Sequence, residues 1–352
     1  MPDDADRYGH HRARWRYRLR MKAPGTRSHR KRPHVAYVVL SHRLTDQVTR
    51  LCEAIHRSSP LASVLVHHDA RRVAPPVSLG SWMHVNVHRQ SADWGSWDLA
   101  AETLRALDLA KRVTHADLLV LISGQDYPTR HLPTWEREFW LAGGGWQGEA
   151  RTLTYRPRWG RASGIGDDDL TRYVYLWWPV PRSHVLLRSG SSVAGFVRRN
   201  LFRIGHWAEP IIDVRVVSRG RGLHLGVRNP FPPFRGQLKC VKGAQWLAVD
   251  STMFDFVRRT HCSSPWLRWC YKHSIIPDES YIQSILASRR APLGPPLTYF
   301  EWSTTDDHPV TLTTEAIQEI RSSGSPFCRK VAPGVSDALM DALDRQITTS
   351  TT

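Results

Sequence analysis

The amino-acid sequence predicts an α/β fold with a mostly parallel central sheet flanked by helices. The first observation is a β-branched apolar run, HVAYVVLS, from His34 to Ser41, which is typical of a buried strand. The second is the helical spacing of apolar residues from Leu44 to Ser58, and the third is another apolar run from Ser63 to Val66. A strand, a helix and a strand at this spacing indicate a βαβ unit, in which the two strands are parallel.

The later elements continue this alternation. Trp82 to Val87 is a predicted strand, and Ser96 is the predicted N-cap of a helix that runs to about Val113. Asp117 to Ile122 (DLLVLI) is the most hydrophobic strand, and we expect it at the centre of the sheet. The remaining predicted elements are a strand over 245–249 and two helices, one from Ser251 and one over 279–288.

Three parts of the chain differ in composition. Residues 1–33 hold 11 Lys or Arg against three Asp, out of a net charge of +17 for the whole chain, and we interpret them as a disordered basic arm. Residues 34–345 form one predicted folded domain, and residues 346–352 are a predicted frayed end. Within the domain, 142–233 shows few clear periods, apart from a predicted basic amphipathic helix over 192–206.

The cysteines and the hydropathy pattern bear on the compartment. The five cysteines are odd in number and form no CxxC pair, so a reducing compartment fits best. No apolar run reaches the ~18 residues of a membrane span, and the basic N-terminus lacks the apolar stretch of a signal peptide. We therefore expect a cytoplasmic protein. The basic arm has the charge for peripheral contact with anionic lipid or nucleic acid, or it is a solvated tail.

Polar clusters follow several predicted strands. His42 follows the first strand, His67, His68 and Asp69 end the second, and Asp126 lies in SGQDYP after the strand Asp117–Ile122. Ligands of open parallel sheets bind beyond the carboxyl ends of strands, so we expect Asp126 to project into a cleft there. His67 and His68 point to opposite faces of a strand and are poorly placed to share one metal ion.

Three further groups each allow a purely structural interpretation and a chemical one. Asp167, Asp168 and Asp169 are acidic enough to hold a cation, but they lie in a Gly-rich loop and indicate a solvated acidic turn. Glu279, in PDES, opens a helix, where it either caps the helix or acts as a general base. Arg329 and Lys330, in FCRK, form either a solvated basic pair or a clamp for a diphosphate.

Taken in order, these motifs resemble the core-2/I-branching β-1,6-N-acetylglucosaminyltransferase family, which includes the peptide O-xylosyltransferases. The resemblance runs from about His34 to Val331 and is poor over 145–242. The motifs that carry it are YVVLSH (37–42), LVHHD (65–69), WGS (94–96), SGQDYP (123–128), GAQW (243–246), PDES (277–280), EWSTTDDHP (301–309) and FCRK (327–330).

The resemblance implies a GT-A-like fold and an inverting transfer of a sugar, xylose or N-acetylglucosamine, from a UDP-sugar to an acceptor hydroxyl. It implies no metal and no cofactor beyond the donor substrate. Glu279 would be the catalytic base, and the implied donor-binding residues are His42, His68, Asp69, Arg329 and Lys330. The expected acceptor contacts are Asp126, Trp246 and Trp302, for a glycan, a protein or a small molecule. Branching members carry a further Arg before the basic pair, where this chain has DDHPVTLT, which favours the xylosyltransferase-like branch.

Three other interpretations stay open. The net charge allows a nucleic-acid-binding protein, which salt-sensitive DNA binding that survives removal of residues 1–33 would favour. A hydrolase that uses Ser123 lacks a GxSxG elbow. A catalytically inactive sugar-binding relative is opposed by the presence of both Glu279 and Lys330.

Overall fold

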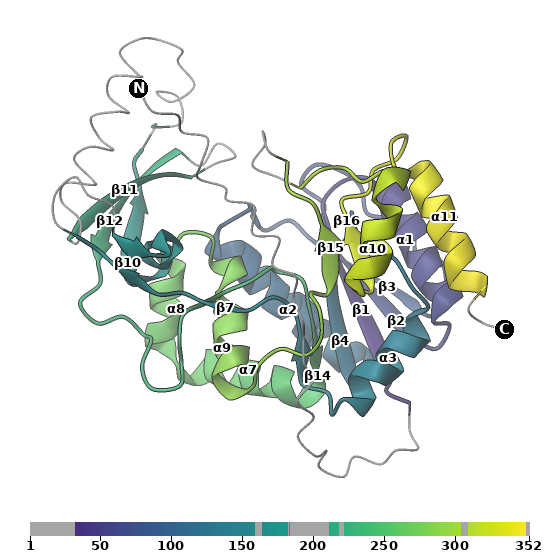
Figure 1. Cartoon of the computed structure of the whole chain (residues 1–352), viewed down its shortest axis with the longest axis horizontal. Coiled ribbons are helices and arrows are strands. Elements are labelled where there is room, and N and C mark those ends of the chain that lie inside the picture. The colour runs from purple at the N-terminus through teal and green to yellow at the C-terminus, as the bar shows by residue number, and fades with distance from the viewer. Residues whose placement is uncertain are drawn as a thin grey trace.

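A six-stranded sheet forms the centre of the computed structural model, which describes residues 32–158, 164–181, 183, 211–217, 222–303 and 309–349 (Figure 1). The first four strands along the chain are parallel, and β14 lies antiparallel beside β4. The strand order is β3 (Met83–His88), β2 (Ser63–Asp69), β1 (Val35–Ser41), β4 (Leu118–Ser123), β14 (Leu247–Asp250) and β6 (Trp146–Gln147). The predicted α/β fold with a mostly parallel sheet is confirmed.

Helices cover both faces of this sheet (Figure 1). The helices on one face are α1 (Thr45–Ser58), α3 (Leu132–Leu141), α10 (Ile317–Ser323) and α11 (Asp337–Thr349). Those on the other face are α2 (Trp97–Thr114), α7 (Ser251–Ser263) and α9 (Tyr281–Arg289), with α8 (Pro265–Lys272) packed beyond them.

The alternation of side chains along β1 explains the two layers. Tyr37 and Val39 belong to the core on the α1 side, whereas Ala36 and Val38 belong to the core on the α2 side. All four are fully buried, because successive side chains of a strand point to opposite faces and both faces are covered. The Tyr37 hydroxyl stays satisfied in this core, since it donates a 2.6 Å hydrogen bond to Glu136 of α3.

Smaller sheets extend the central one. An antiparallel sheet of β10 (Tyr175–Pro179), β12 (Gly222–Arg228) and β11 (Ile212–Val217) lies at one end of the molecule (Figure 1). A second sheet joins β15 (Thr298–Phe300), β16 (Phe327–Arg329) and β5 (Tyr127–Pro128). The two-stranded pairs are β13 (Val241–Lys242) with β7 (Arg151–Thr152) and β8 (Tyr155–Arg156) with β9 (Ile165–Gly166).

The predicted domain boundaries are only partly described. The C-terminal helix continues to Thr349, so the expectation of a frayed end from residue 346 is wrong. Ile347 is buried, and the Gln346 side chain donates to the Thr129 carbonyl at 3.3 Å, which holds this last turn on the domain. Residues 1–31 of the basic arm and the predicted helix over 192–206 lie outside the described residues. None of the described helices has the length and apolarity needed to cross a bilayer.

Candidate active site

The topology of the sheet has a switch point between β1 and β4. From β1 the chain moves outward through β2 and β3, and it then returns to the opposite side of β1 as β4. Ligands of open α/β sheets bind at such a switch point, beyond the carboxyl ends of the strands. His42 follows β1 there, with an exposed side chain, and Ser123 to Asp126 follow β4. A Cβ atom on Gly124 would lie 2.7 Å from Val48 Cγ2 on α1, so glycine lets the turn after β4 pack this closely against that helix.

Asp126, Arg329 and Trp246 meet at this edge. The Arg329 side chain, on β16, places its Nε 3.4 Å from Asp126 Oδ1, and its guanidinium carbon lies 4.4 Å from the centre of the Trp246 ring. The second carboxylate oxygen of Asp126 accepts a 2.8 Å hydrogen bond from the Ser123 amide. Asp126 is completely buried, so the expectation that it projects into the cleft toward an acceptor is wrong: it orients Arg329 instead.

Burial controls the protonation of Asp126. Desolvation raises the pKa of this carboxyl to about 6, against the opposing effects of Arg329 and the Ser123 amide. The Arg329 guanidinium is held between this carboxyl and an indole face, a fixed arrangement that suits bidentate recognition of an anion.

Lys330 and Trp302 follow the two paired strands next to this group, β16 and β15. Lys330 follows β16 directly and is half-buried, and its carbonyl accepts from the Leu312 amide at 2.8 Å. Trp302 is 61% exposed, and its ring meets Phe300 edge-on at 5.8 Å. Phe300 is in turn the register partner of Arg329. The assignment of Lys330 to the donor and of Trp302 to the acceptor stays a prediction.

The end of β2 is held by contacts within the protein. His68 is fully buried: its Nε2 donates to the Val73 carbonyl at 2.9 Å, and its Nδ1 lies 2.8 Å from the Ser41 hydroxyl. Because both ring nitrogens are occupied, His68 fixes the end of β1 and does not face a ligand, which corrects its expected role as a direct donor contact.

Asp69, the last residue of β2, accepts hydrogen bonds on both oxygens from the Arg71 guanidinium, at 2.7–2.9 Å. Burial works to raise the pKa of Asp69, but the hydrogen bonds from Arg71 outweigh it and hold the pKa below its usual value. The guanidinium of Arg71 also pairs with Asp93 at 3.1 Å. The carboxylate of Asp69 is therefore ionised and paired, and its part in donor binding stays a prediction.

Glu279 lies in a short 3-10 turn, Pro277–Glu279, just before α9. Its Oε2 is 3.8 Å from Lys242 Nζ and 4.0 Å from an Arg172 nitrogen, and about a quarter of its side chain is exposed. Two cations at this distance favour the negatively charged carboxylate. A half-buried second carboxyl, Glu149, is close by, and burial together with the charge of Glu279 raises the pKa of Glu149.

The segment Gly243–Trp246 connects Glu279 with Arg329. The Gly243 amide donates to the Glu279 carbonyl at 2.8 Å, and three residues later Trp246 packs on the Arg329 guanidinium. The Gln283 side chain of α9 donates to the Ala244 carbonyl at 2.8 Å, which ties the same segment to the helix that follows Glu279. The motifs GAQW, PDES and FCRK, far apart in the sequence, thus share one site.

The acidic run Asp167–Asp169 is ion-paired, which corrects the expectation of a solvated acidic turn. Asp169 contacts Arg172 at 2.7 Å and Lys242 at 2.5 Å, Asp168 contacts Arg215 at 3.2 Å, and Asp167 pairs with Arg151. Burial works to raise the pKa of Asp169, but Arg172 and Lys242 outweigh it and hold that pKa low. The three carboxylates lie within 4.8 Å of one another, the spacing of a cation site, yet each already has a cationic partner.

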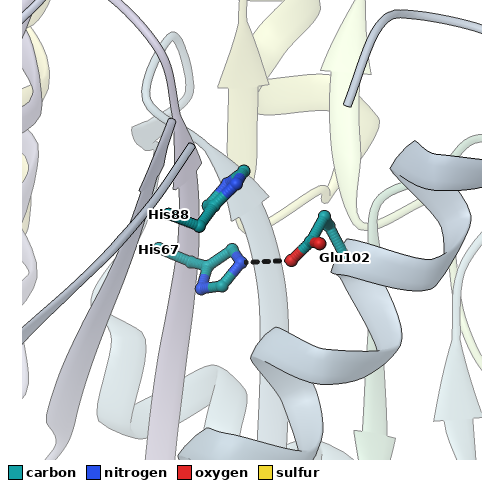
Figure 2. A group of neighbouring side chains, drawn as sticks. All are labelled: His67, His88 and Glu102. Carbon is teal, nitrogen blue, oxygen red and sulfur yellow. Dashed lines mark hydrogen bonds and ion pairs between the residues drawn. The ribbon is translucent and has the colours of Figure 1, made fainter. Parts of the chain in front are cut away.

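His67, His88 and Glu102 form a second cluster with metal-ligand chemistry (Figure 2). His67 Nδ1 lies 2.8 Å from Asn86 Nδ2, and its Nε2 lies 3.1 Å from Glu102 Oε2. Burial lowers the pKa of His67 against the opposing effect of Glu102, so the ring is neutral and donates to the carboxylate. Glu102 also pairs with Arg105. These contacts hold β2, β3 and α2 together, and the expectation that the protein uses no metal stays a prediction.

Sequence reasoning missed Glu149, Arg172 and Lys242, which surround Glu279. Arg172 follows the acidic run, Glu149 lies just before β7, and Lys242 is the last residue of β13. No strand longer than two residues or clear periodicity marks these positions. The only sequence signal for these residues is the density of charged side chains in and around residues 142–233.

Comparisons with known proteins add little to this geometry. Neither a protein-family model nor a curated protein matches the chain. Among solved structures, it is similar to a mannosyltransferase from Pyrobaculum calidifontis, determined with GDP-mannose and Mn²⁺, at 17% identity and a TM-score of 0.27 over 39% of each chain. It is also similar to a putative glucose-1-phosphate thymidylyltransferase from Bacillus anthracis, determined with sucrose, at 8% identity and a TM-score of 0.28, over 64% of this chain and 74% of that one. Likenesses this weak carry no functional argument, so function is argued from the site.

Proposed function

We propose that the protein is an inverting, metal-independent glycosyltransferase of GT-A-like fold that transfers xylose or N-acetylglucosamine from a UDP-sugar to an acceptor hydroxyl. The observation that carries the proposal is the segment Gly243–Trp246, which hydrogen-bonds to the backbone carbonyl of Glu279 at one end and packs on the Arg329 guanidinium at the other. An inverting transfer needs one base and a cationic site for the leaving diphosphate, and these two groups supply both.

Each group has a defined task in this reaction. Glu279 accepts the proton of the acceptor hydroxyl while the acceptor oxygen forms its bond to the anomeric carbon of the donor. The bond from that carbon to the diphosphate oxygen breaks, and UDP departs with the electron pair. Arg329 and Lys330 stabilise the charge that develops on the diphosphate, which fixed cations do without reorganisation. Lys242 and Arg172 keep the base charged until the acceptor hydroxyl approaches.

Asp126 has a positioning role in this scheme. It faces Arg329 from the buried side, so the opposite side of the guanidinium fork is directed to the donor. Trp246 restricts the guanidinium through its indole face, and its expected contact with the acceptor is part of the proposal.

The test is UDP release from a panel of UDP-sugars in the presence of EDTA. We expect turnover with UDP-xylose or UDP-N-acetylglucosamine and a loss of about 10²–10⁴-fold in Glu279→Gln, the usual contribution of a general base. Glu53→Gln, at an exposed carboxylate on α1, is the matched control and should keep full activity. Turnover that EDTA abolishes, or that survives in Glu279→Gln, would contradict the mechanism.

A further inference from the structure

An open groove of about 770 Å³ lies between α2, α7 and α8, and none of the residues at the ends of β1 and β4 lines it. Its lining contains five cationic side chains and one carboxylate, that of Asp108. The cations are Arg105, Arg258, Arg259, Arg268 and Lys272.

Most of this charge is not neutralised within the protein. Arg258 pairs with Asp108 at 3.0 Å, and Arg105 pairs with Glu102. Arg268 donates to backbone carbonyls, which leaves its charge uncompensated. Arg259 and Lys272 have exposed side chains and no hydrogen-bond or ion-pair partner within the described part of the chain. A concave surface with at least three unpaired positive charges attracts an anionic ligand.

Aromatic rings alternate with these cations. The Trp97 ring stacks on His261 at 6.3 Å and 7°, and Trp269, 39% exposed, stacks on Trp266 at 4.9 Å and 14°. Flat indole faces bind the apolar C–H faces of sugar rings, as they do other apolar surfaces. The combination of the exposed Trp269 indole and the half-buried Trp97 indole with Arg and Lys therefore favours a saccharide that carries negative charges over a simple inorganic anion.

The groove adjoins the proposed base through one residue. Tyr281, the first residue of α9, meets the Trp97 ring edge-on at 5.0 Å, and its hydroxyl lies 3.0 Å from His261 Nδ1. Trp97 and His261 both line the groove, and Glu279 precedes Tyr281 by two residues. Contacts through Tyr281 therefore link the groove to the turn that carries the proposed base.

We propose that this groove binds the acceptor and that the acceptor is an anionic saccharide, bearing sulfate, phosphate or carboxylate groups; the inference rests on the proposed transferase function. The salt-bridged side chains hold the groove open, while Arg259 and Lys272 contact the anionic groups and Trp97 and Trp269 contact the sugar rings.

The experiment is calorimetric titration of the full chain with a heparin-derived tetrasaccharide, without donor. In Arg259→Gln/Lys272→Gln we expect the Kd to rise about tenfold or more, because hydrogen bonds to charged groups are worth roughly that much each. The control is Arg321→Gln/Arg345→Gln, which removes the same net charge from α10 and α11, and its Kd should change less than twofold. Equal weakening in both double variants would mean long-range attraction to a basic protein and would overturn the proposal.

Two further arms fix the chemistry of the ligand. The uncharged tetramer of N-acetylglucosamine should bind at least tenfold more weakly than the heparin tetrasaccharide, and equal affinity would overturn the need for charge. A single-stranded DNA octamer that binds more tightly, with its affinity lost in the groove variant, would assign the groove to nucleic acid instead. Binding of the tetrasaccharide is measured without donor, and UDP release is measured separately with donor. Tetrasaccharide binding by a protein that releases no UDP would count against the transferase alone, and UDP release without tetrasaccharide binding would count against the groove alone.

Discussion

Replacing Asp126 with Asn tests the electrostatics at the centre of the site. Asp126 is fully buried, and burial raises the pKa of its carboxyl from an ordinary 3.8 to about 6. At 1.36 kcal/mol per pKa unit, this difference corresponds to on the order of 3 kcal/mol of folding free energy. The folded state binds the proton more tightly than the unfolded state. The contribution is therefore fully present below pH 3.8 and is lost as the pH rises through about 6.

The assay is urea unfolding of wild type and Asp126→Asn at several pH values between 4 and 7.5. The unfolding free energy of the wild type minus that of the variant should fall by ~2–3 kcal/mol between the two ends of this range, since most of the contribution is still present at pH 4. Asn keeps the size of the side chain and removes the titration, and other ionisable groups cancel in the difference. Glu53→Gln, an exposed carboxylate on α1, is the matched control. A difference that stays constant across the range would refute the assignment of a buried, proton-binding carboxyl next to Arg329.

Two predictions concern other parts of the chain. In Gly243→Ala the new Cβ would lie 1.9 Å from the Glu149 carbonyl oxygen, so we expect ~1–3 kcal/mol of destabilisation and loss of UDP release, measured by thermal unfolding and turnover. The control is Gly148→Ala, whose new Cβ has its nearest contact at 3.3 Å and should cost less stability. Equal destabilisation in the two variants would contradict the reasoning. Of the five cysteines only Cys262 is exposed, so one thiol should react rapidly with DTNB in the folded protein and none in Cys262→Ser. Burial raises the pKa of Cys52 and Cys240 to about 12 and that of Cys270 to about 11, and a second equally fast thiol would show that one of these buried sites opens.

The sheet could be predicted because its strands are buried on both faces. Such strands appear as continuous apolar runs, and the predicted strands at 34–41, 63–66 and 117–122 coincide with β1, β2 and β4 to within a few residues. Ser96 is the predicted N-cap of α2, and its side chain accepts from the Leu99 amide. Local chemistry decided both features, so the sequence was sufficient.

The site was less predictable, because its geometry depends on which strand ends meet. Asp126, Trp246 and Arg329 were all identified, but for different substrates, and their mutual contact follows only from the packing of β16 near the end of β4. Asp126 and His68 were assigned to ligands because polar residues at strand ends often bind them, whereas burial gives both of them structural partners. The surroundings of Glu279 come from two-residue strands, which leave no periodic pattern.

The reversed direction of β14 has a consequence for the order of folding. β1 to β4 pair among themselves within residues 35–123, so the half of the site that holds His42 and Asp126 needs no later segment of the chain. β14 pairs with β4 across more than a hundred intervening residues, and its antiparallel course brings the segment before it, Gly243–Trp246, to the edge where the parallel strands end. Long-range pairing of this kind is slow, because loop closure precedes the contacts that reward it. During synthesis the two halves of the site therefore meet late, and we expect the newly made chain to acquire transfer activity only after this pairing has closed the sheet.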